Sequence, residues 1–233
     1  MPNHVTNELR FHHCTEDRFH EILMDIQSDE AGLGSIDFRK LIPEPEGLYM
    51  GDLGIEEMKR YKDNNWYDWR MKNWNTKWNA YGFEPPTYSG DTGTMTFLTA
   101  NCSPFRVLFK LSEKYPDIEF ELRYADEDLG YNVGEISFIA GELIDDNSPR
   151  EGTAAAQELA ADILGIDLTD SKIMIQAHRK KQNPTSVLGG VHHCSSWDDY
   201  NGYVQCLGDD AMESAYIMTE SLFKTYATKY SAA

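Results

Sequence analysis

The chain has 233 residues, enough to bury a substantial core in one large domain or two small ones. It carries 39 acidic against 21 basic residues, and this net charge of -18 repels nucleic-acid backbones and membrane surfaces unless basic residues are concentrated locally. No apolar run of about 18 residues and no signal-peptide pattern is present, so we expect a cytoplasmic protein without a membrane span. Four cysteines in a chain of this length do not form a disulfide framework.

The N-terminal third begins with a strand and a helix. Residues 5–12 alternate and are rich in strand formers, and Thr15 can cap the helix that follows. The apolar residues of that helix recur at helical spacing: Phe19, Ile22, Leu23 and Ile26. Residues 34–47 then predict a short strand that ends at two prolines, which cannot donate to a ladder.

A tryptophan-rich stretch follows. Residues 55–74 predict one long helix or two helical pieces. Asn75 tolerates the left-handed conformation that ends a helix, so we expect the helix to stop there. Residues 76–83 alternate, with Trp78 and Ala80 on one face, and predict a strand.

The middle of the chain gives clearer signals. Residues 94–103 predict a strand and 104–116 a helix, with Pro104 in the first turn and Ser103 as its cap. Its apolar stripe consists of Val107, Leu108, Leu111 and Tyr115.

The next strand, residues 118–128, alternates and is followed by a turn at 129–132. Its inward positions are Ile118, Phe120, Leu122 and Tyr124, and its outward positions are Glu119, Glu121 and Arg123. Residues 133–143 then pair back. This β-α-β-β order predicts an α+β fold, a ferredoxin-like split β-α-β sheet with helices on one face.

Residues 144–233 predict a C-terminal α/β extension. A junction at 144–152 precedes a helix at 153–165 that is capped by Thr153 and stopped by Gly165, and then a strand at 171–178. A long loop leads to a final helix over 209–230 whose tyrosine-rich stripe can pack on its own sheet or, in a homodimer, on a second copy. The expected domains are 1–143 and 144–233.

Several motifs in order resemble the uncharacterised YubB-like ferredoxin-like proteins of phages, plasmids and other mobile elements. They are "MPNHVTNEL", "GSIDFRKLIPEPEGL", "DWRMKNWNTKWNA" and "FLTANCSP" followed by "LSEKYPDIEFELRYADED". The resemblance covers residues 1–143 and implies the ferredoxin-like fold. It supplies no established activity and no catalytic residues.

The charge pattern favours a non-enzymatic acidic protein-binding module that docks a basic surface of a host protein, such as the groove of a nucleic-acid-binding defence protein that it inhibits. Residues 31–110 carry ten acids and ten bases, so the excess negative charge lies elsewhere. The expected acidic partner surface consists of Glu119, Glu121, Asp126, Glu127, Asp128, Asp145 and Asp146. Acidic charge steers such encounters, and salt weakens it.

Two alternatives remain open. Trp66, Trp69, Trp74 and Trp78 interleave with basic residues, a pattern that suits RNA stacking, but a core role is favoured and direct nucleic-acid binding is not expected. His192, His193 and Cys194 form a loop motif for an enzyme or a small-molecule or metal binder, and with His12-His13-Cys14 they offer zinc ligands at unusual spacing. Otherwise no cofactor is expected. An unchanged phenotype in Cys194→Ser would remove the main support for this enzyme or ligand-binding alternative, which ranks ahead of RNA binding.

Overall fold

The computed structural model describes residues 2–166 and 168. The chain divides into two units, Met1–Asp128 with Asn132–Ser148, and Leu129–Tyr131 with Pro149–Ala233. The elements of the first unit are β1 (His4–His12), α1 (Glu16–Ile26), the 3-10 turn η1 (Phe38–Lys40), α2 (Ile55–Tyr61), α3 (Trp66–Trp74), β2 (Thr87–Ser89), β3 (Thr92–Ala100), α4 (Phe105–Lys114), β4 (Glu119–Asp126), β5 (Val133–Ile139) and β6 (Glu142–Asp146).

The strands of the first unit form one antiparallel sheet in the order β2-β3-β1-β4-β5-β6. Both β3 and β4 run antiparallel to β1, which lies between them, so β3 and β4 are parallel to each other. Because α4 joins them, β3-α4-β4 is a split β-α-β unit. The expected α+β class and ferredoxin-like arrangement are therefore confirmed.

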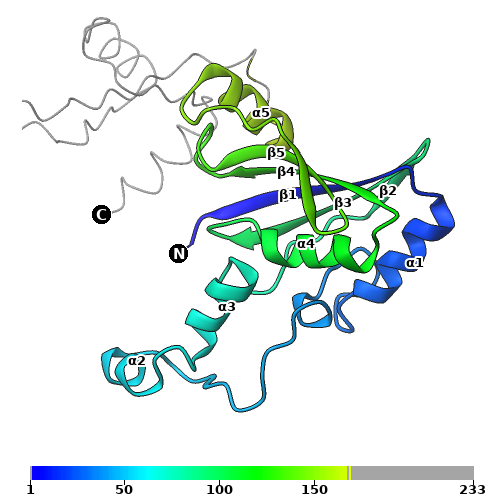
Figure 1. The fold of residues 1–233 in the computed structure, drawn as a ribbon. Helices are drawn as coiled ribbons and strands as arrows, with labels where there is room; N and C mark the ends of the chain where they lie inside the picture. Colours follow the sequence, from blue (N-terminus) through cyan, green and yellow to red (C-terminus); the bar gives the residue numbers. More distant parts are fainter. Residues whose placement is uncertain (1, 167, 169–233) are drawn as a thin grey trace, which may run out of the picture. The chain divides into compact units, whose positions relative to one another are not determined.

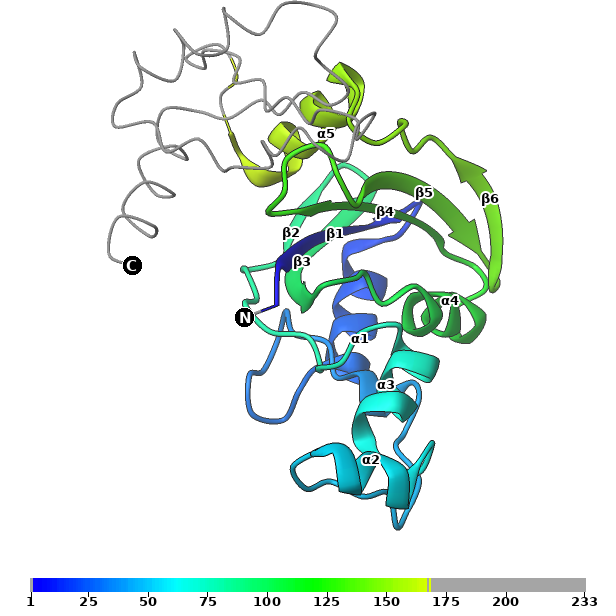
Figure 2. The ribbon, with the colours of Figure 1, turned by 90° about the vertical axis from the view of Figure 1, so that its left-hand side faces the viewer.

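The core lies between one face of this sheet and the helices. In Figures 1 and 2, α1, α3 and α4 lie on the same side of the sheet, as predicted. The sheet contributes alternate residues of its central strands, and α1 and α4 contribute their apolar stripes. The buried core includes Leu9, Phe11, Phe19, Ile22, Trp74, Phe97, Leu108, Leu111, Phe120, Leu122 and Phe138. Leu9 and Phe11 of β1 face this core, so the alternate positions of β1 define an outer face.

Local capping signals give the helix ends that the sequence predicts. The Thr15 hydroxyl accepts a hydrogen bond from the Arg18 backbone N–H and caps α1. The tryptophan-rich stretch forms two helical pieces, α2 and α3, and α3 ends at Asn75 in the left-handed conformation with φ 67°. Asn75 also donates its side-chain amide to the Ser103 carbonyl, which holds this helix end near the start of α4.

Two predicted strands are wrong. Residues 34–47 contain η1 instead, because the Asp37 carboxylate caps this turn and Asn79 bonds both to that carboxylate and to the Phe38 backbone. Residues 76–83 form only one bridge to β3, between Tyr81 and Leu98. Side-chain hydrogen bonds therefore replace the expected ladders in both segments.

Three finer expectations also need correction. Pro104, not Ser103, is the N-cap of α4, and no side chain caps that helix. Residues 133–143 do pair back on β4, through β5, but the chain turns at Ala140 and Gly141, where φ is positive, and its last two residues begin β6. Arg123 does face away from the helices, yet it is only 8% exposed, because it pairs with carboxylates on both neighbouring strands.

The second unit contains α5 (Ala154–Leu164), capped by the Thr153 hydroxyl and stopped by Gly165 in the left-handed conformation, as predicted. The predicted strand at 171–178, the loop after it and the final helix at 209–230 lie outside the described residues. Among residues 2–166 and 168, no helix is both long and apolar enough to cross a bilayer.

Candidate functional site

The seven acidic residues predicted as a partner surface do not form one patch. They fall into three groups: Glu119 and Glu121 on the outer face of β4, Asp126, Glu127 and Asp128 at the end of β4, and Asp145 and Asp146 in β6. Each group has different partners, and those partners decide how much negative charge is left for another molecule.

Glu121 belongs to an ion-pair network on the outer face of the sheet. Arg10 lies 2.6 Å from Glu8 and 2.7 Å from Glu121. Arg123 lies 3.1 Å from the same Glu8 and 3.3 Å from Glu135. None of these five side chains is more than 32% exposed. Because two arginines are shared among three glutamates, most of this charge is neutralised inside the molecule.

Asp145 and Asp146 shape the end of the edge strand β6. The Asp145 carboxylate accepts from the Asp146 N–H and the Asn147 side chain, each at 3.0 Å. The Asp146 carboxylate accepts from the Ser148 N–H at 3.0 Å, and hydrogen bonding to Ser148 lowers the pKa of Asp146. Both residues are exposed, but their oxygens serve the strand end.

Asp126 is a buried structural residue. It is 5% exposed and accepts from the side-chain amides of Asn3 at 2.9 Å and Asn132 at 3.0 Å, and from the Asp128 N–H at 3.1 Å. Asn101 extends the cluster, since its carbonyl accepts from Asn132 and its side chain accepts from the Asn3 N–H. Asp126 therefore ties the N-terminal segment to the turns after β3 and β4.

We expect Asp126→Ala to lower the free energy of unfolding by about 3 kcal/mol, because it leaves amide donors without their acceptor inside the protein. Urea denaturation followed by near-UV circular dichroism measures this loss. The control is Asp63→Ala, at an exposed position, with an expected change below about 0.5 kcal/mol. Equal losses in the two variants would show that Asp126 does not hold these segments together.

Glu127 and Asp128 are exposed at the rim of this cluster, and Glu127 lies beside His4. The Glu127 carboxylate accepts from the His4 N–H at 3.1 Å and lies 3.7 Å from the imidazole Nε2. On the other side of the ring, Nδ1 lies 2.6 Å from the Tyr81 hydroxyl. Burial, and secondarily the Glu127 charge, raise the pKa of Tyr81, so its hydroxyl stays protonated and can donate to Nδ1.

Trp78 lies next to this chain of contacts. Its ring is edge-on to Tyr81 with the centroids 6.2 Å apart, it is 39% exposed, and Lys77 Nζ lies 4.5 Å from its centroid. We call His4, Trp78, Tyr81, Glu127 and Asp128 the acidic–aromatic corner; its members come from three distant segments of the chain. Sequence reasoning identified Trp78 and the two acids, but it missed His4 and Tyr81.

The other tryptophans of the stretch serve the fold. Trp74 is fully buried and donates its indole N–H to the Ile42 carbonyl at 2.9 Å. Arg70 lies 5.2 Å from the ring centroids of both Trp66 and Trp74, and its Nε lies 2.6 Å from a Glu44 oxygen. The core interpretation is therefore confirmed for Trp74 and wrong for Trp78. Arg70 packs between Trp66 and Trp74 and pairs with Glu44 rather than contributing to a positive surface.

The predicted thiol and zinc motif is described only in part. His12 and His13 each lie near a different carboxylate, while Cys14 is buried and burial raises the pKa of its thiol. In the described part of the chain, no three His, Cys, Asp or Glu residues gather as metal ligands. Residues 192–194 lie outside it, so that motif stays a hypothesis.

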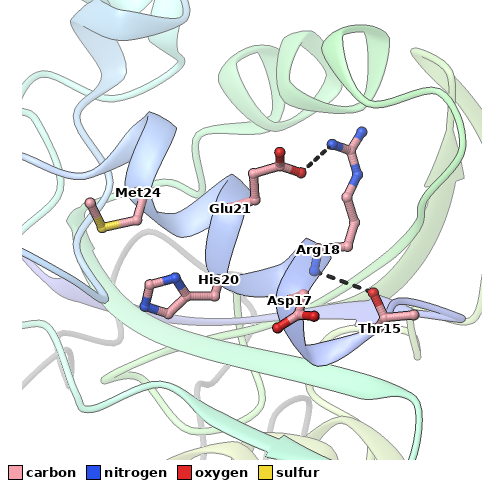
Figure 3. A pocket seen from close by; sticks show the side chains of 6 residues that line it. All are labelled: Thr15, Asp17, Arg18, His20, Glu21 and Met24. Atoms are coloured by element: carbon pink, nitrogen blue, oxygen red, sulfur yellow. Dashed lines mark hydrogen bonds and ion pairs between the residues drawn. The ribbon is translucent and has the colours of Figure 1, made fainter.

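A surface depression runs along α1 (Figure 3). It is lined by Thr15, Asp17, Arg18, His20, Glu21 and Met24. All six belong to α1 or its cap, and the polar contacts drawn there, from Thr15 to the Arg18 N–H and from Arg18 to Glu21, support the helix itself. No lining side chain is buried, so the depression offers no preorganised polar site.

The split unit and the antiparallel sheet define an α+β protein with a ferredoxin-like fold. A family model described as "Ferredoxin-like domain in Api92-like protein" matches residues 73–167, from the end of α3 through α5. That part of the chain is therefore similar to the ferredoxin-like domain of Api92-like proteins. The match continues past residue 143, where the sequence analysis set its domain boundary.

One similar solved structure is the crystal structure of a protein Api92 from Yersinia pseudotuberculosis. The two share 14% sequence identity with a TM-score of 0.38, over 50% of this chain and 40% of the Api92 chain. This chain thus spans less than half the length of that protein. No curated protein matches the sequence.

Proposed function

We propose that the protein is a non-enzymatic, acidic protein-binding module that docks a basic surface of a host protein through the acidic–aromatic corner. The observation that carries this proposal is a chain of contacts in which the half-exposed Trp78 meets Tyr81, Tyr81 meets His4, and His4 meets the exposed Glu127. Of the three acidic groups, this one connects an exposed carboxylate to an aromatic side chain, through His4 and Tyr81. Glu121 is paired with Arg10 inside the molecule, and the exposed Asp145 and Asp146 hold the end of β6.

The chemistry of the corner suits an arginine or lysine side chain. Aromatic faces attract cations, tryptophan and tyrosine are frequent binding hot spots, and carboxylates at the rim steer a basic partner. Lys77 already holds its ammonium group over Trp78. A guanidinium from a partner is less strongly hydrated than an ammonium group and stacks well on aromatic rings, so it can take that place.

The test compares two variants that remove equal charge. Glu127→Gln with Asp128→Asn changes the corner, whereas Glu16→Gln with Asp17→Asn changes exposed acids next to the other end of β1, about 25 Å away. We expect the corner variant to weaken binding of an arginine-rich peptide about tenfold and the control variant less than about twofold. Isothermal titration calorimetry at about 50 mM and about 300 mM salt measures the affinity of the peptide for both variants. We expect the affinity to be lower at the higher salt concentration, because salt screens the charges.

Equal weakening in both variants would show that the peptide responds only to total charge and would end the proposal. Trp78→Ala distinguishes peptide binding from RNA binding. RNA is the remaining alternative, because a nucleobase can stack on Trp78 while Lys77 contacts its phosphate. We expect Trp78→Ala to weaken peptide binding. We expect single-stranded RNA to bind neither the wild-type protein nor the Trp78→Ala variant. Tight RNA binding that depends on Trp78 would replace the present proposal with the nucleic-acid one.

We further propose that the host partner is a nucleic-acid-binding defence protein and that the module acts as an inhibitor carried by a phage or other mobile element. The resemblance of residues 1–143 to YubB-like proteins and the net charge of -18 support this origin. An acidic surface competes with nucleic acid for a basic groove. A gene neighbourhood without mobile-element genes would argue against it.

A further inference from the structure

The ring of Trp78 already carries a positive charge from its own chain. The Lys77 ammonium nitrogen lies 4.5 Å from the ring centroid, inside the roughly 6 Å over which aromatic faces attract cations. Trp78 is 39% exposed, so the same ring is within reach of another molecule. A cation from a partner that uses this ring therefore has to compete with Lys77 for it.

The backbone around Lys77 is held on both sides. Thr76 is fully buried, and its hydroxyl donates to the Ala100 carbonyl at 2.9 Å. Arg70 donates to the Lys77 carbonyl at 3.4 Å, and Asn79 bonds the 3-10 turn η1 and its N-cap residue. Because these contacts fix the chain between residues 76 and 79, the contact of Lys77 with its neighbour Trp78 is present before any partner binds.

Lys77 differs from the lysines that form ion pairs. A carboxylate pairs with each of Lys40, Lys59, Lys110 and Lys114. Among the described residues no carboxylate pairs with Lys77, and its ammonium group lies over Trp78 instead. An exposed cation–π contact shifts an equilibrium only about two- to fivefold. A cation that binds the ring better can therefore displace Lys77.

We propose that Lys77 is an internal competitor for the ring of Trp78, and that this competition makes the acidic–aromatic corner select arginine over lysine. The inference rests on the function proposed above, since it takes a cationic partner to dock at the corner. A lysine of the partner only exchanges one ammonium group for another on the ring. A guanidinium is less strongly hydrated and stacks better on the ring, so an arginine benefits from the exchange.

Two substitutions of Lys77 should change the affinity for an arginine-rich peptide in opposite directions. Lys77→Ala uncovers the ring, so we expect about threefold tighter binding. Lys77→Arg keeps the charge but supplies a stronger internal competitor, so we expect about twofold weaker binding. Isothermal titration calorimetry at about 50 mM salt measures both. The control, Lys72→Ala, removes a charge from an exposed position of the same stretch, and we expect it to change the affinity less than about 1.5-fold.

Trp78→Ala tests whether the ring is the cause. In the Trp78→Ala background we expect Lys77→Ala to change the affinity less than about 1.5-fold, because no ring remains to compete for. A lysine-rich peptide of the same length tests the selectivity. We expect Trp78→Ala to weaken binding of this peptide less than about twofold when Lys77 is present, but about fourfold in the Lys77→Ala background.

The contact is also measurable without a peptide. Protons that lie over an aromatic face give nuclear magnetic resonance signals that are shifted upfield. The ε-methylene signals of Lys77 should therefore be shifted upfield in the wild-type protein and return to their ordinary position in Trp78→Ala. Ordinary Lys77 signals in the free wild-type protein would overturn the proposal, whatever the peptide does.

The peptide measurements separate this inference from the proposed function. If Trp78→Ala and the corner variant leave binding of the arginine-rich peptide unchanged, docking at the corner is wrong and the selectivity is wrong with it. If Trp78→Ala weakens binding but Lys77→Ala tightens it equally with and without the ring, Lys77 acts through its charge alone. Docking then stands and the internal competition is overturned. Unchanged binding in both Lys77 variants leads to the same conclusion.

Discussion

Trp74→Ala is expected to lower the free energy of unfolding by about 4 kcal/mol. Trp74 is fully buried, packs edge-on against Phe38 and Trp69 with centroid distances of 5.7 Å, and donates its indole N–H to the Ile42 carbonyl. Truncation leaves a large cavity between α3 and the sheet and removes the donor to that carbonyl. Urea denaturation of the full chain measures the loss.

Two further variants sharpen this result. Trp74→Phe keeps a ring but loses the indole N–H, and we expect it to lose about half as much. Trp78→Ala removes the same kind of side chain at a half-exposed position, and we expect it to lose less than about 1 kcal/mol. A loss in Trp78→Ala as large as in Trp74→Ala would show that both rings support the core, and Trp78 would no longer be free to bind a partner.

Arg70→Met is expected to lower the free energy of unfolding by about 3 kcal/mol near neutral pH. The Arg70 guanidinium lies between Trp66 and Trp74 and bonds Glu44, whose carboxylate is 13% exposed. Methionine fills part of the space between the rings but leaves that carboxylate paired with Arg39 alone of these two arginines, at 2.8 Å. An incompletely paired, largely buried charge is costly, which accounts for most of the expected loss.

The pH dependence of this loss identifies Glu44 as its source. Burial alone would raise the pKa of Glu44, but hydrogen bonds from Arg70 and Arg39 outweigh burial and lower it. A lowered pKa stabilises the folded state above the pKa of the unfolded chain, about 4.3, and this contribution is lost as the pH falls through the lower folded value. In Arg70→Met the Glu44 carboxyl protonates more readily. The difference in the free energy of unfolding between this variant and wild type should therefore become smaller below about pH 4.5.

Arg39→Met serves as the control, because this side chain is half exposed and its pairing with Glu44 is expected to contribute less than about 1 kcal/mol. Stability curves of the three proteins from about pH 3 to 7 make the comparison. A gap between Arg70→Met and wild type that stays constant over this range would assign the loss to packing between the tryptophans rather than to the buried charge.

Features that depend on neighbouring residues could be predicted from the sequence. Thr15 caps α1 through a residue three positions on, and Asn75 ends α3 by its own backbone conformation, so both were visible in the local pattern. The strand predicted at 76–83 failed because its partners are remote. Thr76 bonds the Ala100 carbonyl, and Asn79 bonds Asp37 across 42 positions. Alternation alone cannot reveal such competing hydrogen bonds.

The candidate site was predictable only in part, for the same reason. A run of acids identified Glu127 and Asp128. It could not show that Asp126 is buried and bonded by two asparagines, Asn3 from the N-terminal segment and Asn132 from the turn after β4. His4 reaches Glu127 through the register of β1 on β4, and Tyr81 reaches His4 through its bridge to β3. Strand register depends on the whole sheet, and composition does not determine it.

The most direct test of the docking surface follows individual tryptophan side chains during binding. In nuclear magnetic resonance spectra the five tryptophans give separate indole N–H signals. The signal that disappears in Trp78→Phe belongs to Trp78, and the signal that disappears in Trp74→Phe belongs to Trp74. Titration with an arginine-rich peptide should shift the Trp78 signal and the ring signals of His4, while the Trp74 signal stays in place. Unmoved Trp78 and His4 signals at saturating peptide would contradict docking at the acidic–aromatic corner.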